Sequence, residues 1–365
     1  MAGFTVAFIG FGLIGGSIAK GLKRDNPRTR IMAYMRTRSK LEQAKADGVV
    51  DVILDAADER LSQCDIIFLC TPVEYNSEYL RKIRPFLKDG AFITDVGSTK
   101  LDIHRTVEAL GFEDVFVGGH PMAGSEKTGY ENASDHLLEN AYYIITPTKK
   151  SRQEDVERLI AAAEAIKAIP IVLDYQKHDL IVAAISHLPH LVASSLVNLV
   201  HDNDGPDEMM KRLAAGGFKD ITRIASASPV MWEQICSANR GPIAFIMEKY
   251  IASLNAVLDE VRRGDSDAIF KLFEDSMNYR NSFTAASKGS LSPDYSFSVD
   301  ILDEPGAISI ISAILAAKGI SIKNIGINHN REHGEGALRI TFYEEEAMQA
   351  AWDNLRHRNY ILIKG

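Results

Sequence analysis

A glycine-rich turn near the N-terminus carries the first residues that could do chemistry. Segment 6–17 reads Val-Ala-Phe-Ile-Gly-Phe-Gly-Leu-Ile-Gly-Gly-Ser, in which an apolar strand runs into G-x-G-x-x-G and then into a helical pattern. In a dinucleotide-binding turn the first glycine permits the turn, the second lets the backbone approach a pyrophosphate, and the third lets the helix pack against the strand. Free N–H groups at the start of the helix then face the phosphates. Gly10, Gly12 and Gly15 hold these three places, so the segment predicts a dinucleotide site.

The end of the second expected strand departs from the usual dinucleotide pattern. That pattern has an acidic residue about 20 positions on, where it binds the ribose 2′-hydroxyl. Here strand 30–35 is followed by Arg36, Thr37 and Arg38, without a carboxylate. An arginine could pair with a 2′-phosphate, or both arginines could be ordinary surface charges. The sequence therefore leaves NAD and NADP both open as the cofactor.

Further candidates follow the later strands of the same pattern. Ligands of an open parallel sheet bind outside the carboxyl ends of its strands, so chemistry is expected there. Thr71 and Pro72 follow the third strand, Ser98 follows the fourth, and His120 lies in a glycine-rich loop after the fifth. With an ordinary pKa of about 6.5, a histidine at this edge suits general-base chemistry at neutral pH. The alternative is a structural histidine that donates a hydrogen bond to a loop carbonyl.

A long apolar helix expected in the middle of the chain carries a second group of polar side chains. Asp179, Ser186 and His190 are separated by seven and four residues, which places them within roughly 40° on one face of an ideal α-helix. They could line a cleft, or they could form a polar network at a helix interface. Pro189 removes the N–H that would bond to the carbonyl of Ile185, so we expect a kink there.

An arginine and a tryptophan further along complete the candidates. Arg223 could bind a substrate carboxylate by bidentate pairing, and Trp232 offers a large aromatic surface close by in the sequence. The alternatives are a surface arginine and a core tryptophan.

Composition and charge narrow the class of protein. The 365 residues are 46% hydrophobic and 25% charged, which is ordinary for a globular protein of two or three domains. The net charge of −8 and the lack of a basic patch with interleaved aromatic residues argue against a nucleic-acid partner. An anionic substrate must therefore be held by a few local cations.

The sequence also predicts a cytoplasmic enzyme without a metal site or a membrane span. Its three cysteines lack metal or redox spacing and suit a reducing compartment. The first expected strand begins within five residues of Met1, which leaves no place for a cationic, apolar leader. The apolar stretch 180–200 is interrupted by two histidines, a proline and an asparagine, so we expect it to stay out of a membrane.

The order of expected strands and helices divides this α/β chain into three parts. Up to residue 173, short apolar strands alternate with helices, which is typical of a Rossmann-type parallel sheet covered on both faces. Residues 174–290 read as helices only. Residues 295–365 read as a ferredoxin-like βαββαβ module, which follows a linker at 288–293.

Five motifs occur in order along the chain: segment 10–17, Asp95-Val-Gly-Ser98, His120-Pro-Met-Ala-Gly-Ser-Glu126, Ser186-His-Leu-Pro-His190 and Gly217-Phe-Lys-Asp-Ile-Thr-Arg-Ile-Ala225. Together they resemble the prephenate/arogenate dehydrogenase family of tyrosine biosynthesis over residues 4–285. The tail, in which Leu302-Asp-Glu-Pro-Gly306 leads an amphipathic helix, resembles an ACT regulatory domain. The resemblance implies that the helical part binds the substrate and forms a dimer.

The resemblance also implies a reaction, the oxidative decarboxylation of prephenate with NAD or NADP. A hydride leaves the hydroxyl-bearing ring carbon, the ring carboxylate leaves as CO2, and aromatisation drives the change. His120 corresponds to the histidine that takes the hydroxyl proton, and Ser98 to the serine that positions the hydroxyl and the nicotinamide. A base within hydrogen-bond reach contributes about 10² to 10⁴ in rate.

The same resemblance assigns residues to the substrate and the cofactor. His190 and Arg223 would bind the two carboxylates of prephenate, and Trp232 would line their pocket. Glu126 would gate that pocket near Arg223. Ser186 and Asp179 would support the helix, and the cofactor would contact Gly10, Gly12, Leu13, Ile14, Gly15, Arg36, Thr37, Cys70, Thr71 and Pro72.

Other functions remain open from the sequence alone. A 6-phosphogluconate or hydroxyisobutyrate dehydrogenase would need a catalytic lysine on the long helix, where this chain has Ser186 and His190. A sensor that has lost its chemistry is disfavoured by the presence of Ser98, His120 and Arg223. Prephenate is expected rather than arogenate, because the family's bacterial members with this domain order commonly use it.

Assembly and control are expected from the last two parts of the chain. The helical part has more apolar helix than one protomer covers, which with the resemblance predicts a homodimer of 40.3-kDa chains. The ACT resemblance implies control by an amino acid, with tyrosine, the end product, expected first. A module that serves only for dimerisation is the alternative. Free N–H groups at the start of its first helix, near Asp303, Pro305, Gly306 and Ala307, could receive an α-carboxylate. Asn324, at the second expected strand, could complete the polar contacts.

Overall fold

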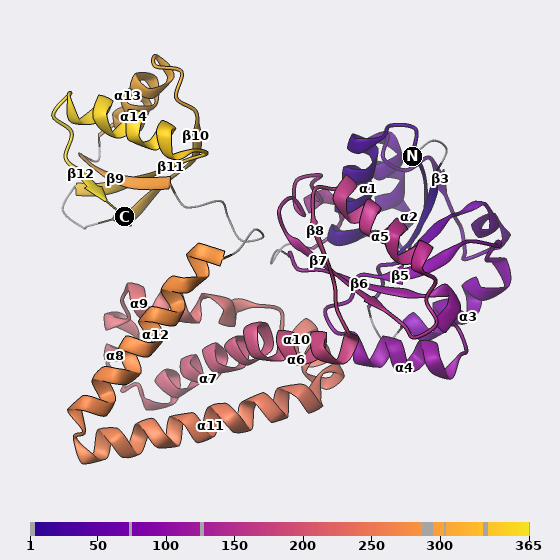
Figure 1. Cartoon of the computed structure of the whole chain (residues 1–365), viewed down its shortest axis with the longest axis horizontal. Helices are drawn as coiled ribbons and strands as arrows, with labels where there is room; N and C mark the ends of the chain where they lie inside the picture. Colours follow the sequence, from indigo (N-terminus) through magenta and orange to yellow (C-terminus); the bar gives the residue numbers. More distant parts are fainter. Residues whose placement is uncertain are drawn as a thin grey trace. The chain divides into compact units, whose positions relative to one another are not determined.

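The computed structural model of the chain describes residues 4–72, 75–124, 128–286, 295–302, 304–330 and 335–364. The chain folds into two compact units, Met1–Ile269 and Phe270–Gly365, whose elements are labelled in Figure 1. The boundary between the units falls inside helix α12 (Ser266–Ala286). It differs from the limits expected at residues 173 and 290, which stay predictions.

A five-stranded parallel sheet forms the base of the first unit. Its strands stand in the order β3-β2-β1-β4-β5, and every neighbouring pair is parallel. The strands are β1 (Thr5–Ile9), β2 (Arg30–Tyr34), β3 (Val52–Ile53), β4 (Ile66–Leu69) and β5 (Phe92–Asp95). The helices of this part are α1 (Leu13–Asp25), α2 (Arg38–Ala46), α3 (Asn76–Ile83), α4 (Leu101–Ala109) and α5 (Gln153–Ala165).

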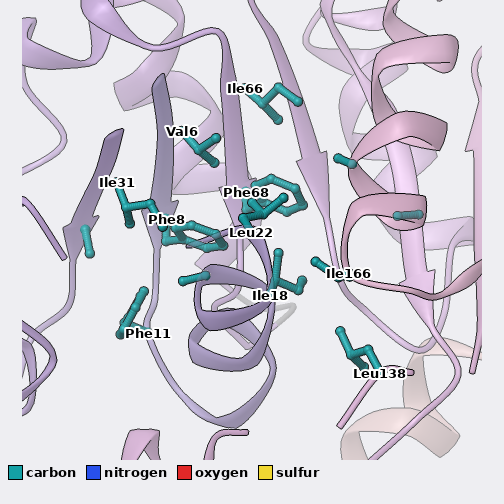
Figure 2. Close-up of a cluster of buried hydrophobic side chains, with 14 of the residues drawn as sticks. Val6, Phe8, Phe11, Ile18, Leu22, Ile31, Ile66, Phe68, Leu138 and Ile166 are labelled. Atoms are coloured by element: carbon teal, nitrogen blue, oxygen red, sulfur yellow. The ribbon is translucent and has the colours of Figure 1, made fainter. Parts of the chain in front are cut away.

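Strand β1 shows why these strands read as apolar runs. All five of its residues are buried, with Val6 and Phe8 in one hydrophobic cluster and Ala7 and Ile9 in another. Phe8 stacks on Phe68 of β4, with ring centres 5.1 Å apart (Figure 2). Because each face of the sheet has its own core, neither face of the strand needs polar residues. The predicted sheet with two covered faces is confirmed.

A second sheet of three strands follows, and here the prediction of one continuous parallel sheet is wrong. In the order β6-β7-β8, the first pair is antiparallel and the second is parallel. A parallel bridge between Ile93 and Phe116 joins the start of this sheet to β5. The strands are β6 (Val117–Pro121), β7 (Tyr142–Pro147) and β8 (Ile169–Val172).

Strand β6 also corrects the place of His120, which lies in this strand and not in the loop expected after the fifth strand. The sequence predicted a loop here because a pair of glycines usually marks a turn. Here the glycines permit close packing. A Cβ on Gly118 would lie 2.3 Å from Thr146 Oγ1, and one on Gly119 would lie 2.7 Å from the last carbonyl of β5.

The remainder of the first unit is helical, as predicted. Helix α6 passes into α7 through a π-helical turn at Ala183–His187. By length and composition the stretch Tyr175–Asn203 is able to cross a membrane, a weak indication because the core helix of a soluble protein passes the same test. The helices are α6 (Tyr175–Val182), α7 (Leu188–Asn203), α8 (Met209–Leu213), α9 (Gly216–Thr222), α10 (Pro229–Ala238), α11 (Arg240–Arg263) and the start of α12.

The second unit contains strands and helices in the predicted βαββαβ order. Its antiparallel sheet has the strand order β10-β11-β9-β12, so that β9 pairs with both β11 and β12. Phe297, Val299 and Leu338 of the sheet pack against Ile311 and Leu355 of the two helices. The elements are β9 (Tyr295–Leu302), α13 (Ala307–Ala316), β10 (Ile322–Asn330), β11 (Glu335–Phe342), α14 (Glu345–Arg356) and β12 (Leu362–Lys364).

Candidate active site

The glycine turn leaves an open helix N-terminus at the end of β1. Gly10 has φ +89°, a conformation that favours glycine, and a Cβ there would lie 2.5 Å from the carbonyl oxygen of Cys70. A Cβ on Gly15 would lie 3.1 Å from the carbonyl oxygen of Gly10. At Gly12, by contrast, a Cβ would meet nothing within 4 Å, and α1 has neither a side-chain cap nor an acidic residue in its first turn. The first N–H groups of α1 therefore face a space that suits an anion.

The other expected cofactor contacts lie around this turn. The N–H of Gly10 donates to the carbonyl of Tyr34 at 2.8 Å, which puts the end of β2 beside it. Thr37 then occupies the N-cap position of α2, and the Arg36 guanidinium lies 5.3 Å from the ring centre of Tyr75. Leu13 and Ile14 open α1, while Cys70, Thr71 and Pro72 follow β4.

A buried ion pair at the end of β5 joins two parts of the site. Lys100 and Asp95 are 0% and 1% exposed, and Lys100 Nζ donates to the Asp95 carboxylate and, at 2.6 Å, to the carbonyl of Gly119. The same carboxylate accepts two backbone N–H groups at 2.9 and 3.1 Å. Burial lowers the pKa of Lys100, although the charge of Asp95 opposes this change. The pair thereby holds the loop of Ser98 against the strand of His120.

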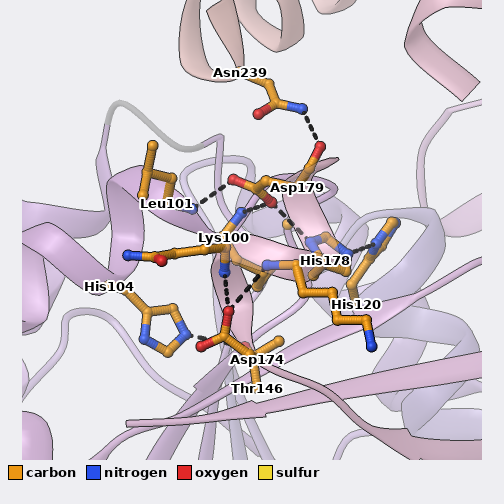
Figure 3. Close-up of polar contacts among 12 residues, drawn as sticks. Lys100, Leu101, His104, His120, Thr146, Asp174, His178, Asp179 and Asn239 are labelled. Carbon is orange, nitrogen blue, oxygen red and sulfur yellow. Dashed lines mark hydrogen bonds and ion pairs between the residues drawn. The ribbon is translucent and has the colours of Figure 1, made fainter. Parts of the chain in front are cut away.

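His120 is the start of a chain of hydrogen bonds that leads into the helical part (Figure 3). Its Nδ1 lies 2.8 Å from Nε2 of His178, and Nδ1 of His178 lies 2.7 Å from Oδ1 of Asp179. The Asp179 carboxylate also accepts the backbone N–H groups of Lys100 at 2.8 Å and Leu101 at 2.7 Å. Asp179 thus fixes the start of α4 to α6 and orients the histidine pair.

Desolvation by the surrounding protein favours the neutral form of the His120 imidazole. Part of the residue is exposed, but the ring is surrounded by protein, and this desolvation lowers its pKa well below the usual value for histidine. The neighbouring His178, Lys100 and His187 lower the pKa further. A neutral ring at physiological pH is the form that accepts a proton.

The predicted common face of Asp179, Ser186 and His190 is wrong. The π-helical turn lies between the first and the last of them, so the rotation of about 100° per residue in an ideal α-helix does not apply. Asp179 is 1% exposed and its carboxylate is used by α4 and His178. Ser186 and His190 do stay together, because His190 Nδ1 donates to the Ser186 carbonyl at 2.9 Å. Pro189 stands in the first turn of α7, directly after the π turn, and the kink expected there stays a prediction.

His190 and Trp232 come together in a small cavity of about 170 Å³. Their rings stack with centres 3.8 Å apart. Trp232 Nε1 is buried and has no hydrogen-bond partner among the described residues. Arg223 is exposed at the start of a helical turn and immediately precedes Ile224, which lines the cavity. The other lining residues are Leu191, Ser194, Ala225, Ala227 and Pro229.

A buried asparagine connects this cavity to the histidine pair. Asn239 Nδ2 donates to the carbonyl of Asp179 at 2.9 Å and to Nδ1 of His187 at 3.0 Å. The His187 ring lies 5.8 Å from the ring of Trp232, centre to centre. The buried contacts of His178, Asn239 and Lys100 were not predicted from the sequence.

Two of the remaining expectations fall outside the described residues. Glu126, expected as a gate, is one, and Asp303, expected to bind an effector, is the other. In the second unit, Gly306 has φ +99° and occupies the N-cap position of α13 without a side-chain cap, between Pro305 and Ala307. Asn324 lies in β10. Within the described ranges, no group of three or more His, Cys, Asp or Glu residues is able to hold a metal ion.

Comparisons with known proteins agree with this arrangement. A family model of the prephenate dehydrogenase nucleotide-binding domain matches residues 18–172, and one of the prephenate dehydrogenase dimerization domain matches residues 174–275. A prephenate dehydrogenase of Bacillus subtilis is 37% identical over 349 residues, which are 95% of this chain and 94% of the relative.

Two solved structures are similar to the chain. The A. aeolicus prephenate dehydrogenase in complex with hydroxyphenyl propionate and NAD+ has a TM-score of 0.71 and 31% identity, covering 77% of this chain and 99% of that one. A Synechocystis arogenate dehydrogenase has a TM-score of 0.71 and 28% identity, covering 77% and 100%. From the two family models and the B. subtilis relative, this chain belongs to the prephenate dehydrogenase family.

Proposed function

We propose that the chain catalyses the oxidative decarboxylation of prephenate to 4-hydroxyphenylpyruvate with NAD. The observation that carries the proposal is a neutral, desolvated histidine, His120, placed in β6 at the edge of the sheets where the glycine turn opens. This combination of a hydride acceptor site and a base suits the oxidation of a hydroxyl-bearing carbon.

The chain's residues account for the proton in this reaction. His120 accepts the ring hydroxyl proton as the hydride leaves the same carbon, and the pair of electrons from the departing CO2 completes the aromatic ring. The proton then returns from His120 to the product oxygen, so the reaction releases no net proton. Ser98, in the loop held by the Lys100–Asp95 pair, would position the hydroxyl.

The described residues around Gly10 fit a dinucleotide. The space in front of Gly12 is open and the start of α1 carries no acidic side chain, so the backbone N–H groups would hold the pyrophosphate. NAD, when bound, supplies the hydride acceptor. We favour NAD over NADP because Arg38 already pairs with Glu42 at 3.2 Å and with Asp55. The A. aeolicus relative was crystallised with NAD+.

The helical part would hold the two carboxylates of the substrate. His190 and Trp232 line the small cavity, and Arg223 immediately precedes its lining residue Ile224 in the chain. Arg223 would supply a local cation of the kind that an anionic substrate requires in a chain of net charge −8. Ser186 and Asp179 would act as supports for this part, and Glu126 as a gate. Trp232 Nε1, buried without a described partner, is a donor for one carboxylate oxygen.

Initial rates with four combinations of substrate and cofactor test this proposal: prephenate or arogenate, each with NAD or NADP. The expected result is the highest kcat/KM for prephenate with NAD and one CO2 released for each NAD reduced. Reduction of NAD without CO2 would contradict the reaction. A kcat/KM about tenfold higher for arogenate would instead move the substrate to arogenate, which is the alternative and which the Synechocystis relative is named for.

We further propose that residues 295–365 of the second unit form an ACT domain through which an amino acid, tyrosine first, inhibits a cytoplasmic homodimer. The βαββαβ order and the uncapped start of α13 support this proposal. Deletion of residues 293–365 should leave activity and abolish inhibition. If neither tyrosine nor phenylalanine changes the rate or the thermal stability of the full chain, the regulatory role fails and the module serves for dimerisation.

A further inference from the structure

The hydrogen bond between His120 and His178 has a defined donor and a defined acceptor. Both follow from the hydrogen bond between His178 and Asp179. The Asp179 carboxylate accepts two backbone N–H groups at the start of α4, at 2.7 and 2.8 Å, in a position where the helix dipole favours a negative charge. An ionised carboxylate is only an acceptor, so His178 Nδ1 must carry a proton and donate it to Asp179 Oδ1 at 2.7 Å.

The protonated nitrogen of His178 determines which nitrogen of His120 carries a proton. A neutral His178 that is protonated at Nδ1 has a lone pair on Nε2, so at 2.8 Å this atom accepts the Nδ1–H of His120. The lone pair of His120 is then on Nε2, the nitrogen that the chain of hydrogen bonds leaves for the substrate. His178 is 1% exposed, so no bulk water is available to replace its bond.

We propose that His178 is a positioning residue that fixes the tautomer of His120 and takes up its Nδ1 proton when the substrate proton arrives at Nε2. This inference rests on the proposed function. The positive charge then lies on His178, directly beside the Asp179 carboxylate, and not on the ring next to the reacting carbon. When the product oxygen takes its proton back from Nε2, the Nδ1 proton returns to His120. The step needs no co-reactant, because both protons retrace their paths.

The surroundings favour this placement of the charge. Four charged or titratable groups face the pair: Asp179 beside His178 on α6, Lys100 at the start of α4, Asp95 at the end of β5, and His187 on the π turn. Lys100 is already neutralised by Asp95 in the buried pair. A positive charge on the ring that touches Asp179 is therefore attracted directly by this carboxylate at hydrogen-bond distance.

Two variants separate this role from a merely structural one. His178→Ala removes the side chain, while His178→Gln keeps a hydrogen-bonding side chain that cannot become charged. His104→Gln serves as the matched control, because His104 is another buried histidine, bonded to Thr146 Oγ1 at 3.0 Å, without a hydrogen bond to His120. Each variant is assayed as the full chain for kcat, KM, NAD affinity and the pH dependence of kcat/KM.

The expected result is a kcat at least about tenfold lower in both His178 variants, with NAD affinity within about threefold of the unmodified chain. In His178→Gln the acid limb of kcat/KM should also move to lower pH, because the ring that shares the proton beside Asp179 is gone. The control should keep kcat within about threefold.

Two outcomes would overturn the inference. One is a His178→Gln variant that loses less than about tenfold in kcat. The other is an acid limb that stays in place or moves to higher pH, as expected if His178 were only a nearby positive charge. If the unmodified chain does not turn over prephenate at all, the proposed function fails and not this step alone.

Discussion

The nucleotide-binding part and the helical part of the first unit differ in how far their apolar residues are buried. In β1 every residue is buried, and both faces of the sheet have complete cores. In α11, Ile251, Leu254, Leu258 and Val261 are 44 to 58% exposed. Their spacing of three, four and three residues places them in one stripe along the helix. The first region completes its core within one chain, whereas the second needs a partner, in agreement with its match to a dimerization domain.

The two regions also contribute different polar residues to the candidate site. In the proposed reaction the nucleotide-binding part would supply the base His120, beside the buried Lys100–Asp95 pair. The helical part would supply His190, Trp232 and the neighbouring Arg223 for the substrate. If this division is correct, changes in the first region act on stability and kcat, and changes in the second act on KM and assembly.

The largest expected effect is in the buried ion pair. Lys100→Met leaves the Asp95 carboxylate buried without its partner and should lower the free energy of unfolding by about 3 to 5 kcal/mol. Lys82→Met is the control and should change the free energy of unfolding far less, since the Lys82–Glu78 pair is more than half exposed and is screened by solvent. Denaturant unfolding measures both. Equal effects of the two substitutions would show that the nucleotide-binding part does not depend on its buried pair.

Arg223→Ala should raise the KM for prephenate far more than it lowers kcat. Loss of a desolvated pairing with a carboxylate costs about 2 to 5 kcal/mol, and such a pairing acts equally on the ground state and the transition state. Arg212→Ala, on exposed α8, is the control. An unchanged KM in Arg223→Ala would remove this arginine from the substrate site.

The stripe on α11 tests the incomplete core of the helical part. Leu254→Glu combined with Leu258→Glu should convert a dimer, twice 40.3 kDa, into a monomer at micromolar concentration by light scattering. Ala256→Glu, on the opposite side of the helix, should leave the dimer intact. A monomeric mass for the unmodified chain would refute the need for a partner.

The smallest effect expected is a shift in the pH profile. Because desolvation lowers the pKa of His120 below its usual value, the base is lost only when pH falls below about 6.5, and kcat/KM should stay level above that value. A limb above neutral pH would mean that the base is not in a desolvated site.

Features that are determined by a few neighbouring residues were predictable from the sequence, and features that depend on distant contacts were not. The glycine turn was predicted correctly, because three glycines within a single six-residue segment define it. Strand β6 was misplaced, because Gly118 and Gly119 look like a loop but serve close packing against Thr146. The face of Asp179, Ser186 and His190 failed because a π turn leaves no mark in the periodicity. His178 and Asn239 were missed because their partners lie 52 to 60 residues away in the chain.

In the proposed reaction His120, held in β6 by the nucleotide-binding part, is the base. The most direct test is His120→Asn, assayed for kcat with prephenate and NAD and, separately, for NAD affinity. The kcat of this variant should be lower by at least about two orders of magnitude, with NAD affinity almost unchanged, because the base is lost and the phosphate-binding turn stays. A variant that keeps about a third of the original kcat would contradict it.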